Sequence, residues 1–249
     1  MREAVIVSTA RTPIGKAFRG AFNDTQAQTL GGHVIAEAVK RAGIEAGEID
    51  DVVLGAAVQQ GTTGFNIARQ AALRAGAPDT VSGMSVDRQC ASGLMAIATA
   101  AKEIVDDGMT ITIGGGLESI SLCQGEHMNR FRLADPALVA SMPALYMAMI
   151  ETAEIVAERY GVSREAQDEY ALQSQQRTAA AQSAGAFEAA ATGRFALRNH
   201  HVALPIRTSS ATIPANSGKS DERFFGGIGV TGSAGFADFA CAGTPTRSE

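Results

Sequence analysis

The pattern of apolar and polar residues in the first half of the chain predicts alternating strands and helices. Four stretches are typical of strands buried in a sheet: residues 4–8, 51–58, 81–86 and 109–113. Three others carry apolar residues at helical spacing: residues 29–42, 66–75 and 94–105. The first strand is continuously apolar, which predicts burial on both of its faces. This order of elements predicts an α/β fold with a parallel or mixed sheet covered by helices.

The pattern changes after Ser121. A helix is predicted over residues 144–160, and a mostly polar helix at the surface over 163–184, with Ser163 as its cap. Over residues 189–249 no strand or helix period is recognisable, and Ala, Gly, Ser, Thr and Pro dominate, as in disordered sequence. We therefore predict three parts: an α/β part over 1–120, a helical loop part over 121–188 and a divergent tail over 189–249.

Composition narrows the function classes. The chain has 249 residues and a formal net charge of −5, and without a basic stripe we expect no nucleic-acid partner. Apolar runs are too short for a membrane span, and the N-terminus does not resemble a signal peptide. The three cysteines are widely spaced, which predicts neither a metal site nor a disulfide framework. We expect a cytoplasmic protein without a metal or bound cofactor.

Cys90 lies where the predicted strand 81–86 passes into the predicted helix that begins near Leu94. Unpaired N–H groups and the positive end of the helix dipole gather at such a junction, so a thiol there loses its proton more easily. The thiolate attacks carbonyl carbon, and the small neighbours Ser92 and Gly93 leave room for a thioester. Most free cysteines are buried small hydrophobes, so these residues alone leave a nucleophile and a core residue as alternatives.

Several segments of the chain resemble the thiolase family, that is, acetyl-CoA acetyltransferases and 3-ketoacyl-CoA thiolases. They are Val5–Gly15, Asn66–Gln70, Arg88–Leu94, Gly114–Ser121 and, in the region that lines the family's CoA tunnel, Met149–Glu154. They follow one another in the family's order and spacing over residues 1–188.

The resemblance implies a fold of two similar α/β halves stacked as five layers, with a loop domain inserted in the first half. It implies that Cys90 takes an acyl group from an acyl-CoA as a thioester, which the deprotonated methyl carbon of acetyl-CoA then attacks to give a 3-ketoacyl-CoA. Thiolysis is the reverse reaction. Met149 is implied as a CoA contact, CoA thioesters as substrates, and a homodimer or homotetramer as the assembly.

The sequence also departs from the family. The family places a histidine in Gly-His-Pro-x-Gly and a second cysteine in Cys-x-Gly-Gly-Gly, and neither segment is present. Asp87 stands where many members have Asn, and an ionised Asp87 would oppose a thiolate at Cys90. We expect the front half of a thiolase followed by an unrelated or out-of-frame tail. The missing segments leave open whether this chain is active alone.

Two other functions stay open at this point. A condensing enzyme of the ketoacyl-synthase kind also uses a cysteine at a strand–helix junction, but with carrier-protein thioesters. A CoA-binding or dimerising remnant without catalysis fits the missing histidine and second-cysteine segments. An acetyl group on Cys90 after mixing with acetyl-CoA distinguishes a catalytic half-reaction from the remnant.

Overall fold

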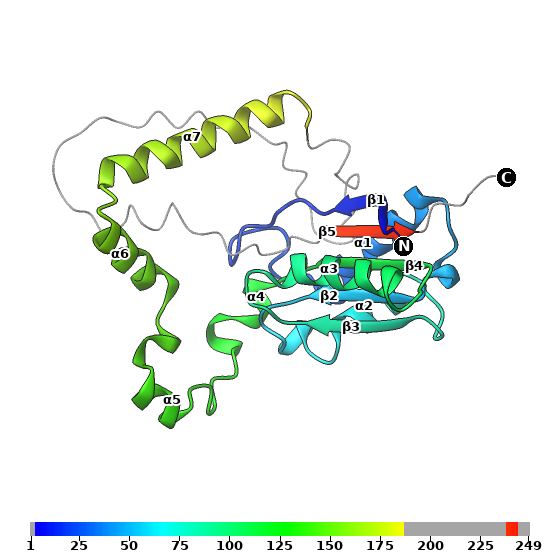
Figure 1. The fold of residues 1–249 in the computed structure, drawn as a ribbon, viewed down its shortest axis with the longest axis horizontal. Helices are drawn as coiled ribbons and strands as arrows, with labels where there is room; N and C mark the ends of the chain where they lie inside the picture. The colour runs from blue at the N-terminus through cyan, green and yellow to red at the C-terminus, as the bar shows by residue number, and fades with distance from the viewer. Residues whose placement is uncertain (1–2, 187–237, 244–249) are drawn as a thin grey trace.

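The computed structural model describes residues 3–186 and the backbone of residues 238–243. A mixed five-stranded sheet, in the order β1-β5-β4-β2-β3, forms its centre (Figure 1). The strands are β1 (Val5–Arg11), β2 (Asp51–Gly55), β3 (Ser82–Val86), β4 (Ile111–Gly116) and β5 (Asp238–Gly243). β2 pairs in parallel with β3 and with β4, whereas β5 runs antiparallel to both β1 and β4. The α/β sheet predicted from the sequence is therefore present.

Helices cover the two faces of this sheet unequally. α1 (Ala27–Ala42) and α2 (Ile67–Arg74) pack against each other and against one face. α3 (Ser92–Val105) lies on the other face, mainly over β4 and β2. The larger core cluster lies under α1 and α2, whereas Ala96 and Ala100 of α3 form a smaller one with Val53. One helix therefore has to cover a face that two helices cover on the opposite side.

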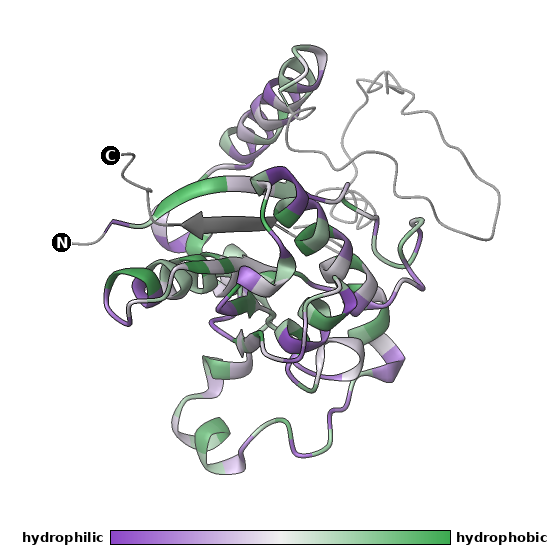
Figure 2. Cartoon of the chain, turned by 90° about the vertical axis from the view of Figure 1, so that its right-hand side faces the viewer, coloured by the Kyte–Doolittle hydropathy of each residue, from purple (hydrophilic) through white to green (hydrophobic). Residues whose placement is uncertain are grey.

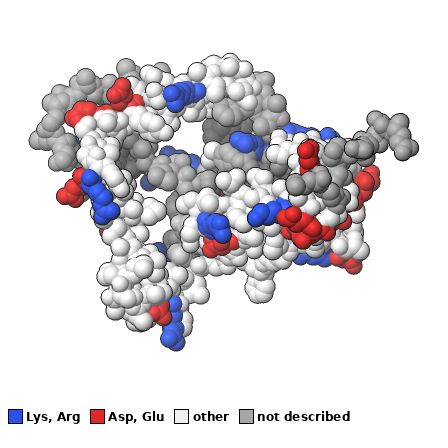
Figure 3. Space-filling view, in the orientation of Figure 1, with Lys and Arg blue, Asp and Glu red and all other residues white. Residues whose placement is uncertain are grey.

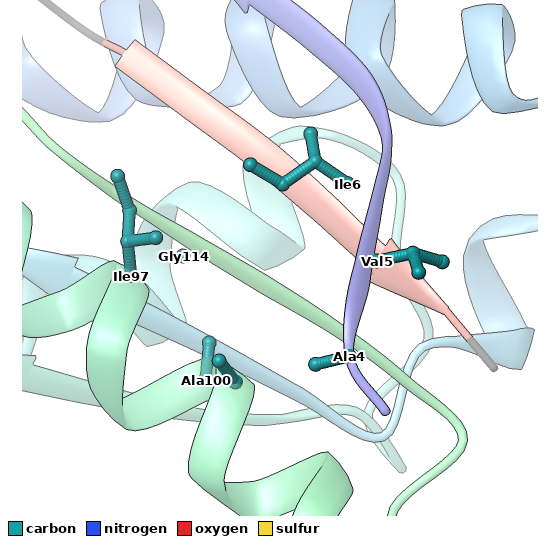
Figure 4. Close-up of a pocket in the computed structure, with 7 residues that line it drawn as sticks. Ala4, Val5, Ile6, Ile97, Ala100 and Gly114 are labelled. Carbon is teal, nitrogen blue, oxygen red and sulfur yellow. The ribbon is translucent and has the colours of Figure 1, made fainter. Parts of the chain in front are cut away.

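Because a single helix covers one face of the sheet, the first strand is more exposed than the sequence predicts. Val5, Ile6 and Val7 are exposed, so the prediction of a strand buried on both faces is wrong for these residues. β1 is an edge strand that packs on α1, and α3 lies mainly over strands further along the sheet. An apolar groove of about 180 Å³ remains between β1 and α3 (Figure 4). Ala4, Val5 and Ile6 line one side of it, and Ile97 and Ala100 line the other.

The fifth strand corrects a second expectation. No regular structure was predicted after residue 188, yet residues 238–243 form β5 in the interior of the sheet. The strand is only six residues long and rich in small residues, so its sequence carries little periodicity. Its backbone pairs on both sides and satisfies the facing edges of β1 and β4. The rest of the predicted tail lies outside the described residues.

The chain between residues 120 and 186 extends away from the sheet (Figure 1). It contains α4 (Ile120–Cys123), α5 (Pro136–Ser141), α6 (Met149–Tyr160) and α7 (Arg164–Ser183). α5, α6 and α7 have no buried residue, although Figure 2 shows apolar stretches on α5 as well as in the sheet region. None of the described helices combines the length and apolarity that a membrane crossing requires.

The helix predicted over 144–160 is divided in two. A 3-10 helix, η4 (Pro143–Tyr146), comes first, and α6 begins only at Met149. Met147 and Ala148 between them have extended backbone, so the helical hydrogen bonding stops there. The helix predicted over 163–184 is confirmed as α7, with the Ser163 side chain accepting from the Ala166 N–H as its cap.

Glu103 is a buried carboxyl on α3, only 7% exposed, and its Oε2 has no hydrogen-bond partner among the described residues. Burial, followed by the nearby carboxylates of Asp51 and Asp107, raises the pKa of Glu103 to about 7. The folded protein therefore holds this proton more tightly than the unfolded chain, where the pKa is 4.5. The associated stability is complete below pH 4.5 and is lost as the pH rises through about 7.

Glu103→Gln should therefore raise the free energy of unfolding at pH 8 relative to the unaltered protein, with little gain at pH 4.5, because Gln cannot ionise. Urea unfolding at the two pH values measures this difference. Glu126→Gln is the matched control, since the Glu126 side chain is 87% exposed. An equal effect of Glu103→Gln at both pH values would contradict the prediction.

Candidate active site

The carboxyl ends of β2, β3 and β4 meet at one edge of the sheet, because these strands run parallel. Cys90 follows β3 by four residues and precedes α3 by two, so it belongs to the turn that joins them. Its side chain is exposed. The structure thus decides against Cys90 as a core residue and leaves its sulfur accessible to a reactant.

The turn is held in an uncommon backbone conformation. Gln89, directly before Cys90, has a φ of 49°, in the left-handed region that residues other than glycine rarely adopt. The Asp87 Oδ1 accepts from the Gln89 N–H at 2.7 Å. The Ser92 hydroxyl accepts from the Arg88 N–H at 2.8 Å and donates to the Gln89 carbonyl at 2.6 Å. These hydrogen bonds hold the residues on both sides of Cys90 in place. A strained backbone conformation such as that of Gln89 persists only when surrounding contacts hold it in this way.

Glycines let α3 lie directly on the strand ends. A Cβ on Gly55, the last residue of β2, would lie 2.2 Å from the Ser92 carbonyl carbon. A Cβ on Gly116 would lie 3.1 Å from the Gly93 Cα, and one on Gly114 would lie 2.7 Å from the Ile97 Cα. The glycine run of β4 therefore makes room for the backbone of α3.

A helix N-terminus and an acidic side chain flank Cys90 along the chain. Cys90 lies next to the N-cap of α3, Ala91, which has no side-chain capping bond. The free N–H groups and positive dipole end of a helix stabilise negative charge within the first turn. Asp87 adds negative charge from the other side, although its Oδ1 is engaged in the turn. The structure thus gives Asp87 a positioning role that the sequence did not reveal.

Glu118, two residues beyond β4 at the same sheet edge, is a half-buried residue with one fully buried carboxyl oxygen. Its Oε2 accepts from the Ala57 N–H at 2.7 Å, and its Oε1 is buried without a hydrogen-bond partner among the described residues. Burial raises the pKa of Glu118, the N–H groups of Ala57 and Val58 oppose the rise, and the Asp87 charge adds to it. Sequence reasoning missed this residue, because a glutamate after a glycine run carries no signal of burial.

The other described cysteine is not a candidate nucleophile. Cys123 is buried, its Sγ lies 3.1 Å from the Thr63 hydroxyl, and it donates to the Gln60 carbonyl at 3.3 Å. No group of three or more His, Cys, Asp or Glu side chains in the described part of the chain is arranged to hold a metal ion. On the face drawn in Figure 3, acidic and basic side chains are interspersed among uncharged residues.

The structure does not bring the two predicted site residues together. Met149 is the first residue of α6, and its side chain is exposed. Figure 1 shows α6 well apart from α3 and the sheet. CoA contact by Met149 therefore stays a prediction. The apolar groove beside β1 contains neither Cys90 nor Met149 among its lining residues, so it does not serve the chemistry of the thiol.

Comparison with known proteins decides the family. The family described as "Thiolase, N-terminal domain" matches residues 4–192. The chain belongs to the thiolase family. The 3-ketoacyl-CoA thiolase of Bacillus subtilis is 44% identical over 188 residues, and the acetyl-CoA acetyltransferase of Escherichia coli is 39% identical over 202 residues.

A solved thiolase has the same fold. The acetyl-CoA acetyltransferase of Bacillus anthracis superposes with a TM-score of 0.65 at 36% identity, over 77% of this chain and 50% of that one. The two curated thiolases each match 76% of this chain, which covers 48% and 50% of their own lengths. The chain thus spans about half the length of the relatives it matches.

Gly55→Ala tests the contact between β2 and α3. The added methyl group would overlap the backbone of Ser92, so we expect a loss of about 2 kcal/mol or more in the free energy of unfolding. Gly93→Ala is the matched control, because its Cβ would meet no atom within 4 Å, and we expect a change within about 1 kcal/mol. Equal stability of the two variants in urea unfolding would disprove the glycine argument.

Proposed function

We propose that this chain performs thiolase-type acyl transfer in the cytoplasm, with Cys90 as the residue that takes the acyl group from an acyl-CoA. The observation that carries the proposal is the exposed Cys90 sulfur on a fixed turn at the N-terminus of α3. Membership of the thiolase family and the names of the relatives support acyl-CoA as the donor.

The proposed step is a transthioesterification. The Cys90 thiolate attacks the carbonyl carbon of the acyl-CoA, and a new bond forms between Sγ and that carbon. The bond from the same carbon to the CoA sulfur breaks, and CoA leaves as a thiolate that takes up the proton which Cys90 gave to solvent. The helix dipole at α3 stabilises the attacking thiolate, and the covalent intermediate divides the overall transfer into two easier steps.

The second step, condensation with acetyl-CoA, needs a catalytic base in addition to the nucleophile. Condensation requires a base that deprotonates acetyl-CoA, and the family's segments for the activating histidine and the second cysteine are absent from this sequence. We therefore propose the acyl-capture step for this chain by itself. The non-catalytic remnant is the second candidate, and the same absence favours it.

Incubation with acetyl-CoA followed by peptide mass spectrometry should find an acetyl group on Cys90. Cys90→Ala should remove the adduct entirely, because alanine has no nucleophile. Cys123→Ala should leave it unchanged, because that sulfur is buried and hydrogen-bonded. An unmodified Cys90 would rule out acyl capture and support the remnant. Transfer from an acyl carrier protein but not from acetyl-CoA would support a ketoacyl-synthase-like enzyme.

We also propose that the protein is a homodimer or homotetramer built near the Cys90 strand. β3 is an edge strand of the sheet, so one row of its backbone groups faces outward. Phe65, just before α2 and close in space to β3, is 99% exposed, and Met84 of β3 is also exposed. An exposed aromatic residue beside an open strand edge is typical of a surface that pairs with another chain.

Phe65→Asp should shift the protein toward the monomer in sedimentation velocity, because a charge would be buried where two edges meet. We expect at least a tenfold weaker association, equivalent to about 1.4 kcal/mol. Tyr170→Asp on α7 is the control, since Tyr170 is also exposed but lies outside the sheet. A monomeric unaltered protein would refute the proposed assembly directly.

A further inference from the structure

We propose that Glu118 is a positioning residue for Cys90, and that it acts through Asp87 on the turn that carries the thiol. The inference deepens the proposed function, because it names a residue that tunes the same sulfur. It arises from three observations at the carboxyl edge of the sheet: a half-buried carboxyl, a buried oxygen of that carboxyl without a partner among the described residues, and hydrogen bonds that join the segments after β2 and β4 to the end of β3.

The first step of the argument is the location of the carboxyl. The Glu118 Oε2 accepts from the Ala57 N–H at 2.7 Å, which ties the segment after β4 to the segment after β2. The backbone continues this contact, because the Leu117 N–H donates to the Gly55 carbonyl at 3.0 Å. The Ala56 N–H donates to the Val86 carbonyl at 3.1 Å, one residue before Asp87. Glu118 is therefore tied by these hydrogen bonds to the strand ends from which the Cys90 turn begins.

The second step is the path to the sulfur. Asp87 is the charged side chain whose field acts on Glu118. The Asp87 Oδ1 in turn holds the N–H of Gln89, the left-handed residue directly before Cys90. A change of charge on Glu118 therefore acts first on the carboxylate that fixes this backbone conformation.

The third step is the set of ionisable groups around Glu118. The end of β2 contributes the N–H groups of Ala57 and Val58. The turn after β3 contributes Asp87 and also holds Arg88 and Cys90, both exposed. No cation appears among the groups that act on Glu118 in the described part of the chain, so the N–H groups of Ala57 and Val58 are what offsets the cost of ionising it.

The protonation state of Glu118 then tunes Cys90. When Glu118 is neutral, its carboxyl adds no charge to that of Asp87 at this sheet edge. When Glu118 loses its proton as the pH rises, two carboxylates lie at the same sheet edge, and both oppose a thiolate. The neutral form is therefore the one that favours a reactive thiol, and burial extends the pH range over which that form persists.

The experiment measures the rate of Cys90 alkylation by iodoacetamide between pH 5 and 10, with each cysteine followed by peptide mass spectrometry. Glu118→Gln keeps an oxygen acceptor for the Ala57 N–H but cannot ionise. We expect it to move the alkylation midpoint of Cys90 to lower pH by about 0.5 unit, which is about threefold in rate below the midpoint. A profile that superposes on that of the unaltered protein overturns the inference.

Glu103→Gln is the matched control, because Glu103 also has one buried carboxyl oxygen without a partner among the described residues, but it lies at the other end of α3. It should leave the Cys90 profile unchanged. An equal shift from Glu103→Gln would mean that stability, and not position, governs the thiol, and would overturn the inference.

A second measurement does not depend on the folding of the Glu118 variant. Carbon-13 NMR of labelled glutamate carboxyls should show Glu118 titrating at lower pH in Asp87→Asn, which removes the charge but keeps Oδ1 as an acceptor. An unchanged titration would overturn the coupling. Alkylation needs no acyl-CoA, so a shifted profile without an acetyl adduct would uphold this inference while refuting the proposed function, and an adduct without a shift would do the opposite.

Discussion

The close approach of α3 to the ends of β2 and β4 is the constraint on which the site depends. Side chains normally separate a helix from a sheet, yet glycines at 55, 114 and 116 remove that separation along one line. The first turn of the helix thereby lies at the level of the strand ends, and the Ser92 hydroxyl reaches back to Arg88 and Gln89. The position of the Cys90 sulfur thus depends on these three glycines, because their lack of side chains lets α3 approach the strands.

Two glutamates near α3 each hold a buried carboxyl oxygen without a partner among the described residues. Glu103 lies on α3 toward its end away from Cys90, and Glu118 lies after β4 at the sheet edge beside the Cys90 turn. At the end away from Cys90 this burial affects only stability. At the end beside Cys90 it changes the charge that the thiol experiences, because Asp87 connects the two. One physical cause therefore has a structural consequence at one edge and a chemical consequence at the other.

Three helices and the position of Cys90 could be predicted from the sequence. The period of apolar residues predicted α1, α2 and α3, and the position of Cys90 between β3 and α3 followed from that order. The left-handed Gln89 could not be predicted, because glutamine shows no preference for that region and the conformation depends on hydrogen bonds from Asp87 and Ser92. β5 was missed because pairing with β1 and β4, not its own periodicity, defines it as a strand. The exposure of β1 depends on where α3 packs on the sheet, and the local sequence of β1 carries no information about that packing.

The distribution of the site along the chain bears on what this half of a thiolase sequence supports. Every contact that shapes the Cys90 turn comes from residues 55 to 118, within one sheet and the helix on it. An accessible thiol on a fixed turn is one requirement of the proposed acyl capture, and these residues supply it. Deprotonation of a methyl carbon needs a base placed against the bound acyl group. Among the described residues, the exposed carboxylate beside Cys90 in the chain is Asp87, whose Oδ1 already holds the turn. The contacts around Cys90 therefore fit the proposed acyl-capture step, whereas the base that condensation needs is not among them.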